Sequence, residues 1–476
     1  MSELKRIFVK GGILSPNELK QIIHHAKSLG LDALHFGSRQ DIILPAHHEN
    51  SNNSEIVNKK NFNTVADTDL QNIVCSYVSA DIFPSTTWLH GSTYLYILES
   101  FKHQPKIKIN ITDPEQGLTP LFSGELNFIA SPHEDYWYLY LNLSHWETQV
   151  YYPVLIYSWD ISKISQAIEE SCRDAEDVEE LFLLVNDTVE ANNRTIEKEL
   201  IIPFKPFPYY EGMNKMGIKQ YWLGLYWRNN KYYLNFLKDF CDFCLENRIG
   251  KICITPWKSF IVKGIPTESK LLLEKFLGKS GINVRHSLLE LNWHLPVADK
   301  EALALKKFIV MNFDQNDIST YGLTFAIVTR ATRKIYFTSI VIEKNKVPDM
   351  MKQYSVRPTY NVLFSEKFDP NSHKYLIYAQ DVDQIELPGL LMELSKLYFE
   401  QLGENDDGHG GLDTKDNEAP ERKQVHQCSN CLTVYDPDFG DSFNEIAPGT
   451  NFEDLPDAYH CSVCASEKKS FKTAII

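Results

Sequence analysis

The chain has 476 residues, which is enough for two or three domains with separate cores. Hydrophobic residues at 43%, aromatic residues at 12% and charged residues at 23% are typical of a folded globular protein and exclude a disordered or fibrous one. The net charge of −15 argues against binding to nucleic acid and favours basic protein partners. Neither a long apolar run nor a signal-like start occurs, so the sequence predicts a cytoplasmic protein without membrane contact.

The first predicted elements are a helix and a strand. Ser15 and Pro16 form a start signal, and an apolar stripe at helical spacing follows them. We expect one strand over 35–45, which has the sequence HFGSRQDIILP. The polar stretch 46–61 then predicts a surface insertion, in which His47 and His48 are solvated.

The sequence between residues 105 and 201 indicates strands followed by helices. The segments 105–111, 125–130 and 136–143 alternate in the manner of sheet strands, and the segments 159–171 and 177–201 have helical patterns. A second copy of the opening layout begins near Tyr221, with a strand, a helix over 232–247 and one further strand over 251–262. This repetition predicts an internal duplication.

After the second copy, the sequence indicates further strands and one helix. We expect strands at 307–313, 323–329 and 334–342, and a closing helix over 387–402. The fold class is therefore α+β, with mixed sheets and packed helices. The polar segment 403–427 predicts a flexible linker to a small module. The predicted domains are residues 1–210 (first repeat), 211–402 (second repeat), 403–427 (linker) and 428–476 (C-terminal module). We call residues 1–402 the body and residues 428–476 the module.

Two C-x2-C motifs predict a metal site in the module. The first pair is Cys428 and Cys431, the second is Cys461 and Cys464, and 29 residues separate the pairs. Four thiolates that converge in a tetrahedron hold either zinc or iron, and the spacing alone leaves both metals open. The other five cysteines stand in apolar or helical sequence and are interpreted as buried thiols.

The residues around these motifs narrow the choice of metal. The segments VYDPDFGD, IAPGTNFEDLPDAYHC and KKSF follow in an order that closely resembles the rubredoxin family over the whole module. The resemblance implies one iron ion bound by the four cysteines and one-electron transfer. It also implies a small aromatic core that shields the metal, made of Tyr435, Phe452, Tyr459 and Phe471.

The module departs from this family at three positions. Leu432 and Ala465 replace the glycines that usually follow each second cysteine, and Ser462 replaces a proline. A glycine would ease a left-handed turn, so a side chain there is expected to cost about 1 kcal/mol. The module also carries eight acidic residues against three lysines, a net charge of −5. Such a surface fits either a basic redox partner or ordinary solubility.

The body resembles the nitrite and sulfite reductase family. The segment 11–44 looks like its ferredoxin-like half-domain, whose strand ends in a triplet that here is Ser38-Arg39-Gln40. The segment 254–266 resembles the second half-domain, and PKIKINI (105–111) resembles the strand that opens the sirohaem-binding domain. The resemblance implies that Arg39, Lys106 and Lys108 face sirohaem carboxylates or a bound oxyanion. The alternative is that the two lysines form a solvated strand edge.

The catalytic members of that family carry cysteine pairs for a four-iron cluster, and this chain lacks them. No cysteine lies between Cys253 and Cys428, and Gln71 stands where the family has an arginine. We therefore expect no four-iron cluster, and sirohaem is doubtful. The sequence favours an electron carrier whose body docks a redox partner, with nitrite or sulfite assimilation as the setting. The alternatives are a sirohaem-dependent nitrite or sulfite reductase fed by its tethered rubredoxin, and a zinc-stapled binding protein.

Overall fold

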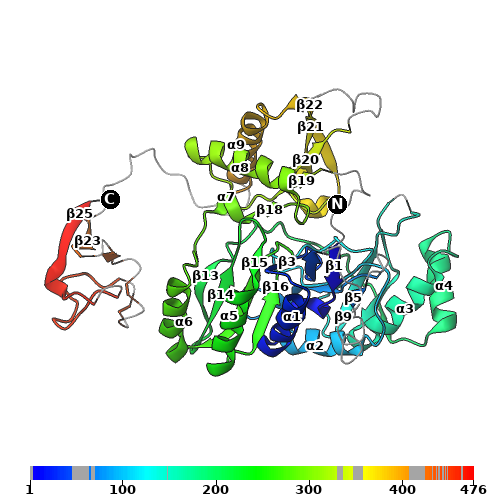
Figure 1. Ribbon diagram of the computed structural model, residues 1–476, viewed down its shortest axis with the longest axis horizontal. Coiled ribbons are helices and arrows are strands. Elements are labelled where there is room, and N and C mark those ends of the chain that lie inside the picture. The colour runs from blue at the N-terminus through cyan, green and yellow to red at the C-terminus, as the bar shows by residue number, and fades with distance from the viewer. Residues whose placement is uncertain are drawn as a thin grey trace. The chain divides into compact units, whose positions relative to one another are not determined.

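The computed structural model describes residues 4–45, 64–65, 70–146, 148–329, 336–346, 357–406, 424–430, 433–435, 437, 440–441, 444, 446–447, 449–462 and 465–475. The chain forms two compact units, Met1–Glu404 and Asn405–Ile476 (Figure 1). The predicted insertion at 46–61, with His47 and His48, lies outside the described residues, and so does most of the predicted linker. Across the described ranges, no helix has the length and apolar character needed to cross a membrane.

Two five-stranded antiparallel sheets form the centre of the body, and they exchange strands. The first has the order β15 (Tyr232–Tyr233), β3 (Ala33–Phe36), β4 (Ile42–Pro45), β1 (Leu4–Ile7), β5 (Thr64–Val65). The second has the order β13 (Gly212–Met216), β14 (Gln220–Leu225), β17 (Phe260–Pro266), β16 (Lys251–Ile254), β2 (Ile13–Leu14). Because β15 pairs with β3 and β2 pairs with β16, each sheet takes one strand from the part of the chain that forms the other sheet.

Three helices belong to these sheets. They are α1 (Pro16–Ser28), α5 (Leu234–Glu246) and α6 (Thr267–Lys279), and Figure 1 shows α1 beside α5. The predicted start of α1 is confirmed, because the Ser15 hydroxyl accepts a hydrogen bond from the Glu18 amide and the Glu18 carboxylate accepts one from the Ser15 amide. This reciprocal pairing satisfies two donors that a helix start otherwise leaves open.

The two long strands predicted over 35–45 and 251–262 are each a hairpin instead. The first turn closes through the Gly37 amide and the Asp41 carbonyl at 2.8 Å, and the second through the Thr255 amide and the Ser259 carbonyl at 2.9 Å. Gln40 (φ 57°) and Lys258 (φ 58°) occupy the same left-handed position in the two turns. The strand prediction failed because apolar runs on both sides of a polar turn look like one alternating segment.

Each copy continues into a layer with a mixed sheet. In the first the sheet order is β12 (Asn193–Thr195), β11 (Val154–Tyr157), β9 (Tyr136–Leu141), β8 (Leu126–Ala130), β7 (Ile109–Thr112), β6 (Val74–Cys75), and β10 (Val150–Tyr151) pairs with β9. In the second it is β18 (Trp293–His294), β19 (Phe325–Val328), β20 (Ile340–Lys344), β21 (Thr359–Ser365), β22 (Tyr375–Asp383). In both sheets the first three strands in chain order are parallel and the next is antiparallel. The predicted α+β fold with mixed sheets is confirmed.

The helices of these layers are α2 (Gly91–Ser100), α3 (Ile161–Ser171), α4 (Val178–Thr188), α7 (Leu288–Leu291), α8 (Lys300–Gln315) and α9 (Leu387–Asp406). The strand predicted at 307–313 is wrong, because these residues lie in α8. Asp299 caps this helix by accepting a hydrogen bond from the Ala302 amide at 3.0 Å. Leu305, Ile309 and Phe313 are buried at a spacing of four, so the apolar run has a helical period.

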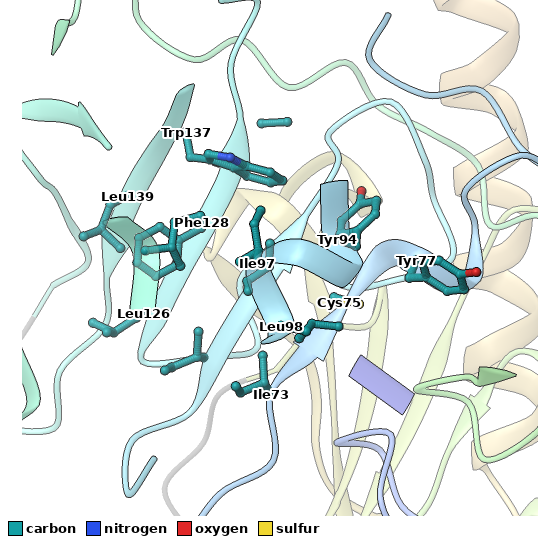
Figure 2. Packing of buried hydrophobic residues seen from close by; sticks show 14 of the residues in the cluster. Ile73, Cys75, Tyr77, Tyr94, Ile97, Leu98, Leu126, Phe128, Trp137 and Leu139 are labelled. Carbon is teal, nitrogen blue, oxygen red and sulfur yellow. The ribbon is translucent and has the colours of Figure 1, made fainter. Parts of the chain in front are cut away.

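Buried cysteines belong to the cores of the body. Cys75 lies within the core of the first mixed-sheet layer, and Figure 2 shows it close to Leu98 of α2. Gly11 has φ 60°, and a Cβ atom there would lie 2.6 Å from the Cys75 sulfur, so a side chain at this position would be both strained and crowded. Cys241 and Cys244 are buried on α5 in the half-domain core. The interpretation of these residues as small hydrophobes agrees with this packing.

The second unit contains a three-stranded antiparallel sheet. Its order is β24 (Val434–Tyr435), β23 (Gln424–Cys428), β25 (Phe471–Ile475). A small core of Tyr435, Phe452, Leu455 and Tyr459 packs within the same unit. Because a core this small stabilises a fold only weakly, domains of this size usually need a metal or another cross-link.

Candidate metal centre

The two cysteines of the module that the structure describes are both buried. Cys428 ends β23 and is 0% exposed, and Cys461 is 3% exposed. Cys431 and Cys464 lie outside the described residues. Burial of two thiols in a unit with so small a core is consistent with a structural role for their sulfur atoms.

The loops that follow Cys428 and Cys461 close in the same way. The Cys428 amide donates to the Thr433 carbonyl at 2.8 Å, and the Cys461 amide donates to the Ser466 carbonyl at 2.8 Å. In the second loop Ala465 has φ 57°, the left-handed conformation that the missing glycine predicted. Leu432, at the matching position in the first loop, lies outside the described residues. Two matched turns therefore present the first cysteine of each motif.

An aromatic cluster lies beside the turns, as the sequence predicted. Phe452 contacts Tyr435 with a centroid distance of 5.6 Å and Phe471 with one of 5.2 Å. The Tyr459 hydroxyl donates to the Asp441 carboxylate at 2.8 Å, and burial raises the pKa of Tyr459. The hydroxyl thus has a partner within the module, and the ring surfaces can exclude water from the neighbouring cysteines.

Sequence reasoning missed one member of this cluster. The His426 ring stacks on Phe452 with a centroid distance of 4.1 Å and an interplanar angle of 9°. His426 lies two residues before Cys428 on β23, so both side chains project from the same face of the strand. That alternation was the signal that could have placed His426 beside the aromatic cluster.

The chemistry of the donor set fits a metal that prefers sulfur. The module offers thiolates from two short motifs, and its described part buries the first cysteine of each next to aromatic rings. Soft thiolate ligands select iron or zinc in a tetrahedral arrangement. Cys431 and Cys464 complete the set in the sequence, and assigning all four as ligands remains a prediction.

Arg39 lies in a buried hydrogen-bond network of the body. The residue is 9% exposed, and its guanidinium donates to Asn110 Oδ1 at 2.6 Å and to the backbone carbonyls of Asn72 (2.9 Å) and Ile109 (2.8 Å). Burial lowers the pKa of Arg39 to about 10. Both terminal nitrogens are used inside the protein, and Nε has no hydrogen-bond partner in the described structure. A role of Arg39 toward a sirohaem carboxylate remains a prediction, and we derive no step through that cofactor.

The two predicted lysines lie before β7 rather than in it. Lys106 is exposed and Lys108 is half-buried. The Lys106 amide donates to the Glu169 carboxylate at 2.8 Å, and the Lys108 amide donates to the Glu125 carboxylate at 3.0 Å. Backbone contacts with acidic side chains therefore fix this segment. A role of the two ammonium groups toward an anion remains a prediction.

The cysteines of the body stay protonated in this environment. Burial raises the pKa of Cys75 to about 12 and that of Cys241 to about 12, and it also raises the pKa of Cys253. Metal ligation requires the thiolate form, which burial of this kind disfavours. Cys428 and Cys461 of the module are buried as well, and they differ from these thiols because each belongs to a C-x2-C motif.

Comparison with known proteins assigns separate relatives to the two units. Residues 425–471 match the rubredoxin family. The chain is 52% identical over 46 residues to Rubredoxin-2 of Desulfovibrio desulfuricans, which covers 10% of this chain and 74% of that protein. It is 42% identical over 45 residues to Rubredoxin-2 of Chlorobaculum tepidum, which covers 10% of this chain and 86% of that protein.

The body has a relative among solved structures. The structure of the Mycobacterium tuberculosis NirA protein matches with a TM-score of 0.64 and 14% sequence identity, and it covers 83% of this chain and 81% of that one. At this identity the likeness is one of fold. It agrees with the prediction of a reductase-like body fused to a rubredoxin-like module.

Proposed function

Through residues 425–471 this chain belongs to the rubredoxin family, and we propose that its module carries single electrons between redox proteins. The proposed ligands of one iron ion are Cys428, Cys431, Cys461 and Cys464. When bound, an iron ion in a thiolate site supplies one-electron chemistry. The observation that supports this proposal best is the pair of matched turns at Cys428 and Cys461, both buried beside the aromatic cluster.

The residues of the module have separate tasks in this proposal. The turns orient the cysteines, and the rings of Tyr435, Phe452 and Tyr459 keep water away from them. A dry environment lowers the cost of a change in charge at the metal and helps to set its potential. The net charge of −5 steers the module toward a basic partner.

We further propose that the body acts as a docking scaffold for the partner oxidoreductase. It has a reductase-like fold, but the chain lacks the cysteine pairs of the four-iron cluster and uses Arg39 internally. The pairing of Arg39 also speaks against the rival proposal, a sirohaem-dependent nitrite or sulfite reductase. A partner in nitrogen or sulfur assimilation follows from the resemblance of the body.

Metal analysis and visible spectroscopy of the full chain test the first part. We expect one iron ion per chain and a colour that bleaches with one electron and returns on oxidation. Stoichiometric zinc from cells grown with ample iron would contradict iron binding. Strong tetrapyrrole bands would support the reductase instead.

Cleavage between the units tests the scaffold. A protease site introduced near Gly410 allows the intact and the cleaved protein to be compared at equal concentration. In a soluble extract of the source organism, the NAD(P)H-dependent bleaching of the cleaved protein should be much slower, because tethering to a docked body raises the local concentration of the module. Its reaction with cytochrome c, a basic acceptor that needs no scaffold, should be unchanged. Equal rates in the extract would refute the docking role.

A further inference from the structure

The second hairpin turn of the body carries a buried lysine with few partners. Lys258 is 7% exposed, and its Nζ donates to the Leu295 carbonyl. Within the described part of the chain, no carboxylate forms an ion pair with it. An ammonium group has three donors, so this contact leaves most of its capacity unused. A buried charge in this condition is costly unless another group compensates it.

Two other buried lysines of the body show how such groups are normally satisfied. Lys306 Nζ lies 3.0 Å from the Glu290 carboxylate and donates to the Tyr226 hydroxyl at 2.7 Å. Lys263 Nζ donates to the Tyr77 carbonyl at 2.5 Å and to the Ala80 carbonyl at 2.6 Å. Each of these two lysines has at least two hydrogen-bond acceptors. Among these three buried lysines, Lys258 therefore has the fewest acceptors.

A small cavity lies at Lys258. Its volume is about 30 Å³, and four aromatic side chains contribute to its wall, namely Tyr226, Trp227, Trp257 and Trp293. Arg228 also lines it, and no acidic side chain does. A volume of this size holds one or two water molecules or an ion of similar radius. The cavity thus combines small size with a positive charge.

The charged groups around Lys258 do not neutralise it fully. Burial and the charge of Lys306 together lower the pKa of Lys258 to about 7, while the charge of Asp41 acts in the opposite direction. The Asp41 carboxylate is buried and lies 3.8 Å from Arg6, with one oxygen unpartnered in the described structure. His294 is also close enough to feel the ammonium charge, and its Nε2 has no partner in that same structure.

From this geometry we infer that the cavity binds a small monovalent inorganic anion of about the size of chloride, held by the Lys258 ammonium. The anion supplies the acceptor that the protein does not, and the aromatic walls limit its size. The small volume between the aromatic walls favours chloride over larger tetrahedral anions. This site is independent of electron transfer by the module.

Chlorine NMR line widths of chloride solutions test the inference on the full chain. The intact protein should broaden the line in a saturable manner, and bromide should remove the broadening while sulfate at equal ionic strength should not. Lys258→Met should lose the saturable broadening. Lys307→Met is the matched control, because Lys307 is an exposed lysine that lines a neighbouring surface hollow. It should keep the full effect.

A second measurement covers the case in which Lys258→Met does not fold, which near-ultraviolet circular dichroism reports. For the intact chain and for Lys307→Met, replacing gluconate by chloride at constant ionic strength should raise the unfolding temperature of the body, and above the dissociation constant the rise should follow the logarithm of the chloride concentration. The inference is overturned if the intact chain shows neither broadening nor a shift. It is also overturned if folded Lys258→Met broadens the line as strongly as the intact chain, or if sulfate displaces chloride as well as bromide does.

Discussion

The module and the body treat their chemically active side chains in opposite ways. In the module, Cys428 and Cys461 belong to short motifs, and matched turns place these two cysteines beside the aromatic cluster. In the body, Arg39 is folded into a hydrogen-bond network, and the thiols are buried in apolar cores. The comparison teaches that the module carries its candidate groups in short local motifs, whereas the body holds Arg39 through contacts with residues that are distant in the sequence.

The largest expected effect is on the metal. Cys461→Ser should reduce the iron content of the chain from about one ion to a small fraction, because loss of one thiolate opens the tetrahedral site. The tryptophan fluorescence of the body should not change, since all eight tryptophans lie before residue 294. Cys172→Ser is the matched control in the body and should keep the iron. Iron loss in both variants would contradict the division of roles.

The next effect concerns Arg39. Arg39→Met should destabilise the body by on the order of 3 kcal/mol, because the Asn110 side chain and two backbone carbonyls lose a buried donor. Denaturant unfolding followed by tryptophan fluorescence measures this loss, while the visible band of the module should keep its midpoint. Lys106→Met, at an exposed site, should change the stability by less than about 0.5 kcal/mol. Similar small effects of both changes would indicate that Arg39 has no structural role.

The third effect is a dependence of stability on pH. The pKa values of Lys258 and Lys306 are lowered to about 7 and about 8 in the folded body. An unfolded lysine keeps its proton to about pH 10.4, so above pH 7 the unfolded state binds more protons, and the stability of the body rises with pH. The slope is at most about 1.4 kcal/mol per pH unit for each lysine.

Unfolding temperatures at about pH 7 and pH 8.5 measure this rise. Lys258→Met should stabilise the body more at the lower pH and so reduce the rise, whereas Lys307→Met should leave it unchanged. The rise in stability is expected only up to about pH 9. Above that pH the thiols of Cys75 and Cys241, whose pKa values are raised to about 12, make the stability of the body fall as the pH increases. An equal rise in both variants would show that Lys258 is not the group that titrates.

The sequence predicted what depends on neighbouring residues and missed what depends on distant ones. The metal motif, the capped helix at Ser15 and the α+β fold follow from local patterns. The pairing of Arg39 with Asn110 joins residues 71 positions apart, and no local pattern indicates it. Lys258 could have been noticed, because the two turn sequences GSRQD and TPWKS align with a cation in place of Gln40. The strand predicted in α8 failed because β-branched and aromatic residues also suit a buried helix face.

The smallest effect is at the left-handed residue of the metal loop. Ala465 has φ 57°, and a side chain in this conformation costs about 1 kcal/mol, which glycine avoids in exchange for greater freedom in the unfolded chain. Ala465→Gly should therefore stabilise the iron-loaded module by about 0.5 kcal/mol, seen as a higher guanidinium midpoint for loss of the visible band. Ala458→Gly, at an exposed residue of the same module without a positive φ, should lower that midpoint or leave it unchanged. If both glycine variants shift the midpoint in the same direction, the strain at Ala465 does not limit the stability of the module, and the departure from the family at this position has no energetic cost.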